Sequence, residues 1–221
     1  MGVRAGSEGM SFKRDYVENP GDKLKGKHVL VLCAQEFEDI ELLYPVLRLS
    51  EEGAAVTVAV LRRGLHPRPW WNEKPITGRF GSTVPIVVMA ERERYNIIEI
   101  PEAKPEDYDA VIIPGGFAPD YLRCDRTTLK LVADMYKMGK VIAAICHGPQ
   151  VLISADAVFG TDMVKGRDVT CWDAVVDDIK NAGGNFKPLP ARRDGNIITG
   201  RFPDALPQFM KAIIDALTGE N

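Results

Sequence analysis

The chain has 221 residues, 45% of them hydrophobic, and its 28 lysines and arginines against 31 acidic residues give a net charge of −3. This near-neutral balance excludes the basic footprint of a dedicated nucleic-acid binder. Purely apolar runs of at most six residues exclude a membrane span, which needs about 20. Residues 1–25 are polar and lack the apolar segment of a secretory signal, so we expect a cytoplasmic protein with reduced thiols.

The first predicted elements follow this polar leader and form one supersecondary unit. The apolar run at 27–34 predicts a buried strand, the apolar spacing at 41–52 predicts a helix, and 55–61 predicts a second strand. Strand, helix and strand within about 35 residues form a βαβ unit with a right-handed crossover. A parallel sheet is therefore expected to begin here.

The next stretch, 62–106, is rich in proline and less regular, with one short strand expected at 83–89. The alternation then resumes, with strands predicted at 110–113, 140–145 and 196–199 and helices at 119–138, 151–158, 173–182 and 203–217. This pattern predicts an α/β fold in which helices cover both faces of a mostly parallel sheet. With no linker in view, the length corresponds to one domain after the leader.

Three turns that follow predicted strands carry groups suited to chemistry. They hold an acidic segment at 35–39, the pair Gly115 and Gly116, and the sequence Cys146-His147-Gly148. In a doubly wound sheet, ligands bind beyond the carboxyl ends of the strands. We therefore expect a carboxylate, free backbone amides and a thiol beside an imidazole to converge at one edge of the sheet.

Cys146 is the candidate nucleophile because it ends an apolar strand and precedes a helix. A helix N-terminus and a neighbouring cation can lower a cysteine pKa from ~8.5 to as little as ~3.5. The alternative is a buried cysteine that only completes a core strand, and the spacing favours neither. For Cys33, Cys124 and Cys171 a packing or surface role is the better interpretation.

The remaining candidates leave choices open. The amides of Gly115 and Gly116 can receive a developing oxyanion, although an isolated Gly-Gly is more often an ordinary loop. One buried carboxylate near the thiol can donate a hydrogen bond or move a proton, but the residue pattern does not choose between Glu36 and Glu38. Wide cysteine spacings and only three histidines predict neither a metal site nor a cofactor.

Three segments in order resemble the PfpI family of the class I glutamine amidotransferase-like superfamily: EFEDIELLYP at 36–45, IIPGGFAPDYLR at 112–123 and AAICHGPQVLISA at 143–155. The segments at 172–184 and 198–210 are similar to that family too. The resemblance implies a flavodoxin-like three-layer sandwich over 26–218, preceded by the leader at 1–25. It also implies assembly as a homodimer or homohexamer.

The resemblance further implies a role for individual residues. The family's nucleophile falls on Cys146, its adjacent histidine on His147 and its buried glutamate on Glu38. The oxyanion amides would be those of Gly115, Gly116 and His147. Members proposed to act as proteases use a glutamate from a neighbouring subunit to orient the histidine, and this chain carries the shorter Asp120 at that position.

Three functions are compatible with these residues. The first is a glutathione-independent glyoxalase or deglycase, in which Cys146 adds to a small dicarbonyl such as methylglyoxal and Glu38 or His147 moves protons. The second is an intracellular cysteine peptidase or amidase, with His147 as general base and Asp120 orienting it. The third is a redox-responsive, chaperone-like protein whose Cys146 is oxidised to a sulfinate held by Glu38. A buried carboxylate suits proton transfer better than peptide hydrolysis, which favours the first.

Overall fold

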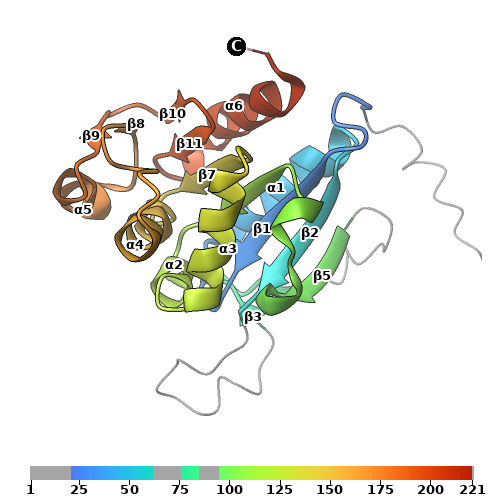
Figure 1. The fold of residues 1–221 in the computed structure, drawn as a ribbon. Coiled ribbons are helices and arrows are strands. Elements are labelled where there is room, and N and C mark those ends of the chain that lie inside the picture. Colours follow the sequence, from blue (N-terminus) through green and yellow to red (C-terminus); the bar gives the residue numbers. More distant parts are fainter. Residues whose placement is uncertain (1–20, 62–75, 85–94, 221) are drawn as a thin grey trace, which may run out of the picture.

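A seven-stranded sheet forms the middle layer of the structure (Figure 1), a computed structural model that describes residues 21–61, 76–84 and 95–220. In spatial order its strands are β10 (Ala191–Asp194), β11 (Ile197–Gly200), β7 (Val141–Ile145), β6 (Ala110–Ile113), β1 (His28–Cys33), β2 (Ala55–Val60) and β5 (Tyr95–Glu99). All neighbours are parallel except β10 and β11. This confirms the predicted sandwich with its mostly parallel sheet.

The central strands are apolar along their whole length because helices cover both of their faces. Every residue of β6, β7 and β11 is buried, and β1 is exposed only at its first residue. Strands buried on both sides read as continuous runs of branched residues and not as alternating ones. The register places Val29 opposite Ala110 and Ala110 opposite Val141, so three such runs pack side by side.

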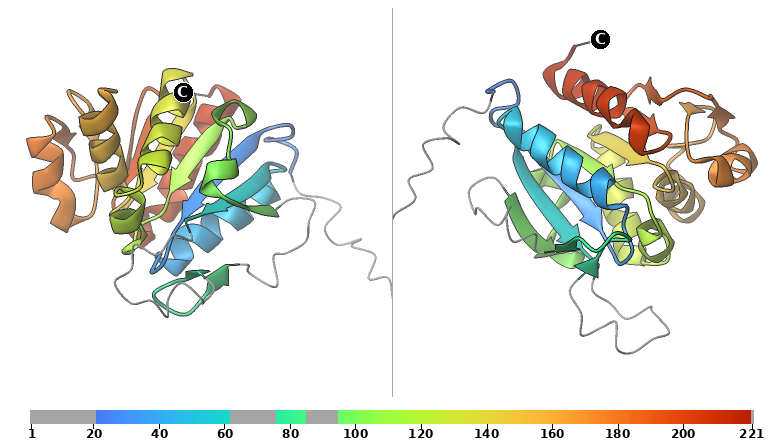
Figure 2. Two further views of the ribbon diagram at one scale, coloured as in Figure 1. Left: turned by 60° about the horizontal axis from the view of Figure 1, so that its bottom comes forward. Right: turned by 180° about the vertical axis from the view of Figure 1, so that it is seen from behind.

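Helices form the two outer layers. Helices α1 (Asp39–Glu51) and α6 (Leu206–Thr218) contact each other on one face, which is turned to the viewer in the right panel of Figure 2. The other face carries α2 (Ala118–Leu122), α3 (Arg126–Lys137) and α4 (Pro149–Phe159), with α5 (Val176–Asn181) packed on α4. Short strand pairs are β3 (Ile76–Thr77) with β4 (Thr83–Val84), and β8 (Asp168–Val169) with β9 (Asn185–Phe186). The 3-10 turns are Ile100–Glu102, Pro105–Asp107, Asp173–Val175 and Pro203–Ala205.

Several sequence predictions need correction. The single helix predicted at 119–138 is two helices, because the Asp125 carboxylate accepts the Thr128 N–H at 2.8 Å and caps a new helix there. Strand β10 was missed, since its Ala-Arg-Arg-Asp sequence is that of a polar edge strand. Of the strand predicted at 83–89, only Thr83–Val84 lies within the described residues. Leu24 is fully buried and its N–H donates to the Glu52 carbonyl, so packing begins before residue 26.

The strand order reverses direction between β1 and β6. From β1 the chain moves outward to β2 and β5, and it then returns to the other side of β1 to lay down β6 and β7. The loops at the carboxyl ends of two adjacent strands therefore diverge at this point and leave a crevice, which is where open α/β sheets bind ligands. The loops that leave β1, β6 and β7 are the three chemistry-bearing turns of the sequence.

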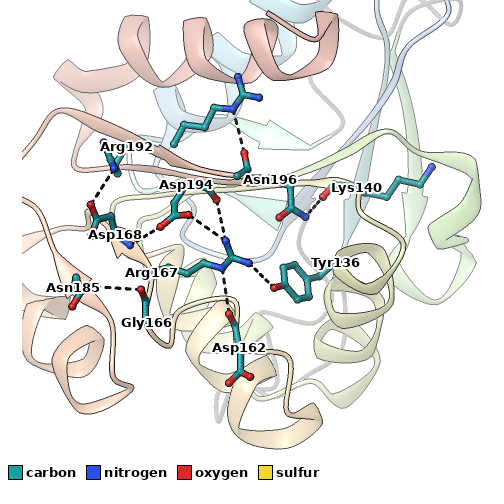
Figure 3. Close-up of polar contacts among 12 residues, drawn as sticks. Tyr136, Lys140, Asp162, Gly166, Arg167, Asp168, Asn185, Arg192, Asp194 and Asn196 are labelled. Carbon is teal, nitrogen blue, oxygen red and sulfur yellow. Dashed lines mark hydrogen bonds and ion pairs between the residues drawn. The ribbon is translucent and has the colours of Figure 1, made fainter. Parts of the chain in front are cut away.

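A polar cluster centred on Arg167 holds the edge of the sheet to the helical layer (Figure 3). The Arg167 guanidinium donates to the Tyr136 hydroxyl of α3 at 2.8 Å and to the Asp194 carboxylate of β10 at 3.3 Å. Asp194 in turn accepts the Asp168 N–H at 2.9 Å, and Asp168 accepts from Arg192 at 3.0 Å. Arg167 thus joins α3, β8 and β10 through hydrogen bonds and an ion pair.

Replacing Arg167 with methionine is expected to lower the free energy of unfolding by about 1–3 kcal/mol, because hydrogen bonds from a charged, half-buried donor are lost and Asp194 loses its ion pair. Urea unfolding followed by circular dichroism measures this loss. Lys180→Met is the control, since Lys180 and its partner Asp177 are 60% and 90% exposed and such pairs contribute little. Equal losses in both variants would contradict the role of the cluster.

Candidate active site

The loops that follow β1 and β6 are joined by backbone hydrogen bonds. The Glu38 N–H donates to the Gly115 carbonyl at 3.2 Å, and the Phe117 N–H donates to the Glu36 carbonyl at 2.8 Å. Glu36 takes a left-handed conformation, with φ of 59°, that makes the second of these bonds available. The acidic loop and the Gly-Gly loop therefore form one rigid floor beside the end of β7.

Cys146 stands on a strained elbow between β7 and α4. Its φ is 60°, a left-handed value that is uncommon for a residue other than glycine, asparagine or aspartate. Two hydrogen bonds hold this conformation, from the Cys146 N–H to the Gly200 carbonyl at 2.9 Å and from the Trp172 N–H to the Cys146 carbonyl at 3.0 Å. A Cβ on Gly148 would lie only 2.8 Å from the Ile145 carbonyl, so the turn needs glycine there. The elbow aims the thiol away from the strand and toward the Gly-Gly loop.

The buried carboxyl group beside this thiol belongs to Glu41. Its side chain interacts with Cys146, is completely shielded from solvent, and accepts the Gly115 N–H through Oε2 at 2.7 Å. Its Oε1 has no conventional hydrogen-bond partner among the described residues. A Cβ on Gly115 would lie 2.6 Å from the Cys146 Cβ and 2.7 Å from Glu41 Oε2, so the close approach of thiol and carboxyl requires glycine.

The expectation that Glu38 is this buried glutamate is wrong, and so is the narrowing of the choice to Glu36 or Glu38. Glu38 precedes α1 and forms an ion pair with Arg79 at 3.2 Å, whereas Glu41 lies one turn further into the helix and faces the sheet. The missed signal is the position of Glu41 on the buried stripe of α1, beside the buried Leu42 and Pro45. A charged residue on such a stripe needs a special partner.

Burial decides the protonation of this pair. Burial raises the pKa of Glu41 to about 8. The hydrogen bond from the Gly115 N–H lowers this pKa, and the nearby Glu38 carboxylate raises it further. Burial also raises the pKa of the Cys146 thiol, and a charged Glu41 carboxylate raises it further. The N–H groups of Gly116 and His147 lower this pKa. The low thiol pKa expected from a helix terminus is therefore offset by desolvation. A protonated Glu41 carries no like charge and has an unpaired oxygen, so one proton shared with the sulfur satisfies both groups.

The backbone amides divide between two tasks. The N–H groups of Gly116 and His147 are directed at the Cys146 sulfur, where they stabilise negative charge. The Gly115 N–H is taken by Glu41 Oε2 and is not free to receive an oxyanion. The predicted set of three amides is corrected to two, because the third serves to hold the carboxyl group.

His147 and Asp120 lie on the solvent side of the thiol. The imidazole is half-buried, and its ring centroid is 6.3 Å from that of Phe117. Burial lowers the pKa of His147, the Asp120 carboxylate raises it, and the Arg79 cation lowers it. Asp120 is exposed and lines a cavity of about 520 Å³ with Glu36, Phe117, Tyr121 and Cys124. No hydrogen bond joins the side chains of Asp120 and His147 within the described chain.

The other cysteines differ from Cys146 in their surroundings. Cys33 and Cys171 are fully buried, and burial raises the pKa of both thiols. Cys124 is exposed on the rim of the Asp120 cavity. In the described ranges no group of three histidine, cysteine or acidic side chains is arranged to hold a metal ion, and no helix is long and apolar enough to cross a membrane.

The raised pKa of Glu41 predicts a stability that falls as pH rises. The folded state holds the proton up to about pH 8, whereas the unfolded chain releases it near its ordinary value of about 4.3. Between these values folding binds a proton, so the free energy of unfolding decreases by up to about 1.4 kcal/mol per pH unit. Urea unfolding of the wild type and of Glu41→Gln, carried out from about pH 5 to about pH 8, measures this slope.

The wild type is expected to lose stability over that interval and Glu41→Gln to lose much less. Glu51→Gln is the control on the same helix, because the Glu51 side chain is 71% exposed. A slope in Glu41→Gln as steep as that of the wild type would contradict a protonated Glu41.

Known proteins resemble this chain over nearly its whole described length. A family model described as the DJ-1/PfpI family matches residues 27–216. A deglycase from Pyrococcus abyssi (strain GE5 / Orsay) is 36% identical over 189 residues, which cover 86% of this chain and 98% of that protein. The protein/nucleic acid deglycase 2 of Escherichia coli (strain K12) is 32% identical over 192 residues, covering 86% and 98%.

Solved structures of related proteins have a fold similar to that of this chain. A two-domain protein from Anabaena variabilis, with DJ-1/ThiJ/PfpI-like and ferritin-like domains, has a TM-score of 0.70 and 32% identity over 88% of this chain and 50% of that chain. Drosophila melanogaster DJ-1beta has a TM-score of 0.67 and 23% identity, over 88% of this chain and 91% of that chain. The α/β sandwich thus matches the fold of DJ-1/ThiJ/PfpI-like structures.

Proposed function

Because the chain belongs to the DJ-1/PfpI family, we propose that it is a cysteine-dependent enzyme that acts on small reactive dicarbonyls such as methylglyoxal without glutathione. The observation that carries the proposal is the buried Glu41 carboxyl group against the Cys146 thiol. A group that holds a proton at neutral pH and releases it to a bound substrate suits proton transfer between adjacent carbons. Relatives named deglycases support activity on carbonyl adducts.

The first step forms a bond between the Cys146 sulfur and the aldehyde carbon. The shared proton lies on Glu41 when the sulfur attacks as a thiolate, and it passes to the former carbonyl oxygen to give a hemithioacetal. The N–H groups of Gly116 and His147 stabilise the negative charge during this step. Glu41 is left as a carboxylate, close to the carbon that carries sulfur.

The second stage moves hydrogen from one carbon of the dicarbonyl to the other. Glu41 takes the proton from the carbon bound to sulfur and passes it to the neighbouring carbonyl oxygen, which gives an enediol. It then moves the remaining hydroxyl proton of the first carbon to the second carbon, which gives a thioester. Water cleaves the thioester, and lactate, one proton and the free thiol result. No external oxidant or reductant takes part, since one carbon is oxidised as the other is reduced.

Three further roles belong to the same proposal. His147 activates the water that cleaves the thioester, because its lowered pKa leaves the imidazole neutral near pH 7. Asp120 orients the histidine of a neighbouring subunit in a homodimer or homohexamer. Deglycation of protein adducts would use the same hemithioacetal, which joins this activity to that named for the relatives.

Incubation of the purified protein with methylglyoxal tests the proposal, with lactate measured by an independent enzymatic assay and by NMR. Time-dependent lactate formation that needs no added thiol is the expected result. A panel of fluorogenic peptides run beside it tests the peptidase alternative, and mass spectrometry after mild peroxide tests oxidation at Cys146. Absence of lactate at every methylglyoxal concentration would overturn the proposal.

A further inference from the structure

The hairpin of β3 and β4 is fastened to the loop between β1 and α1. The Glu36 N–H donates to the Thr77 carbonyl at 2.8 Å, and the Arg79 N–H donates to the Phe37 carbonyl at 3.0 Å. The Asp39 carboxylate accepts the N–H groups of Phe80 at 2.8 Å and Ser82 at 2.7 Å. A Cβ on Gly78 would collide with that carboxylate, so glycine permits the contact. The hairpin is therefore built onto the loop that leads to Glu41.

Arg79 extends from this hairpin across the mouth of the candidate active site. Its guanidinium pairs with Glu38 at 3.2 Å and lies over the Phe117 ring, 4.9 Å from the centroid. Phe117 in turn contacts the His147 ring at 6.3 Å between centroids. One side chain thus connects the residue before α1 to the aromatic ring that flanks the histidine. Such a stack of a cation over an aromatic face is favourable even at an exposed position.

We propose that Arg79 is a positioning residue of the active site, which holds Phe117 against His147 and places a positive charge near the imidazole. The inference rests on the proposed function for its kinetic consequence, because a neutral His147 is the form that accepts a proton from water. It goes beyond the cysteine, histidine and glutamate of that function, and it gives the hairpin a task in catalysis.

The charges around His147 account for the sign of the effect. From α2 the Asp120 carboxylate favours the imidazolium, and from the hairpin the Arg79 cation opposes it. The groups on the α1 side are Glu38, which is paired with Arg79, and Glu41, which holds a proton below about pH 8. The Cys146 thiol is the neighbour on the elbow itself. Loss of Arg79 removes a positive charge and leaves Glu38 unpaired, and both changes favour protonation of His147.

Titration of the imidazole by NMR tests this inference without reference to activity. The chain has only three histidines, and the His147 signal is assigned by its absence in His147→Gln. In Arg79→Gln the titration midpoint of His147 is expected to rise, whereas Arg79→Lys, which keeps the charge, is expected to restore it toward that of the wild type. Arg193→Gln is the matched control and should leave the midpoint unchanged, because Arg193 lies on the edge strand β10 and donates to the Gly195 and Glu220 carbonyls.

The kinetic arm measures lactate formation against pH in the same variants. In Arg79→Gln the acid limb of the pH–rate profile is expected to move to higher pH. The kcat near pH 6 is expected to fall several-fold, because the fraction of neutral imidazole sets the rate there, whereas kcat near pH 8 changes little. A midpoint that does not move in Arg79→Gln, or a loss of rate equal at all pH values, would overturn the role of Arg79. If the wild type forms no lactate, the proposed function fails while the NMR titration still decides this inference.

Discussion

Replacing Cys146 with alanine is expected to lower lactate formation from methylglyoxal by roughly 10³-fold or more, because the hemithioacetal cannot form and no other group in the site replaces the sulfur. The rate is measured at a high concentration of the variant, so that a slow residual rate is detectable, and it is compared with the rate in buffer alone. The variant is expected to fold, since alanine occupies less space than cysteine and is no more strained at a φ of 60°. Circular dichroism and the urea midpoint establish this.

Cys124→Ser is the matched control for the loss of a thiol. Cys124 is exposed beyond the end of α2, on the rim of the Asp120 cavity and not among the groups around the Cys146 thiol, so its replacement is expected to change the rate less than about twofold. Alkylation of Cys124→Ser, which lacks the exposed thiol, followed by mass spectrometry adds a second readout, with the label expected at Cys146 and slowed while methylglyoxal is present. Full activity in Cys146→Ala would remove the basis of the proposed function.

Replacing Glu41 with glutamine is expected to lower lactate formation by about 10²-fold or more, within the range that a positioned acid–base group contributes. Glutamine retains an oxygen that can accept the Gly115 N–H, so the loop stays in place. It cannot take up or release the proton that moves between the two carbons. The loss is therefore expected in kcat, with KM changed little.

Glu38→Gln is the matched control, because the sequence favoured Glu38 as the partner of the thiol and the structure favours Glu41. Glu38 pairs with a partly exposed arginine at the rim and does not touch the thiol, so the expected loss is less than about tenfold. The two variants make the same chemical change three residues apart on one segment. A larger loss in Glu38→Gln than in Glu41→Gln would return the catalytic role to the position that the sequence predicted.

Most elements of the fold follow from local pattern. The strands at the centre of the sheet are continuous apolar runs, and the predicted bounds of β1, β6 and β7 agree with the structure within one or two residues. The pattern failed where burial is incomplete. Strand β10 is half-buried along its length and carries two arginines that belong to the Arg167 and C-terminal contacts, so no apolar signal marks it.

The site divides in the same way. Turns after successive strands, the Gly-Gly pair and the Cys-His-Gly elbow are visible in the chain, because parallel topology brings the carboxyl ends of strands to one edge. Which glutamate reaches the thiol is not visible, since Glu38 and Glu41 are separated by one turn and both stand in an acidic run. That choice depends on how α1 is rotated about its axis, and packing of Leu42, Val46 and Leu49 on the sheet sets the rotation.

The sequence by itself predicted an α/β fold of the PfpI type with Cys146 at a strand-to-helix turn, and the structure has both features. Only the tertiary structure decided that Glu41 is the buried partner of the thiol, that the Gly115 amide serves Glu41, and that Arg79 lies over Phe117. The physical reason is that periodicity records which residues are buried, whereas protonation and hydrogen bonding depend on the few ångströms between side chains from different elements.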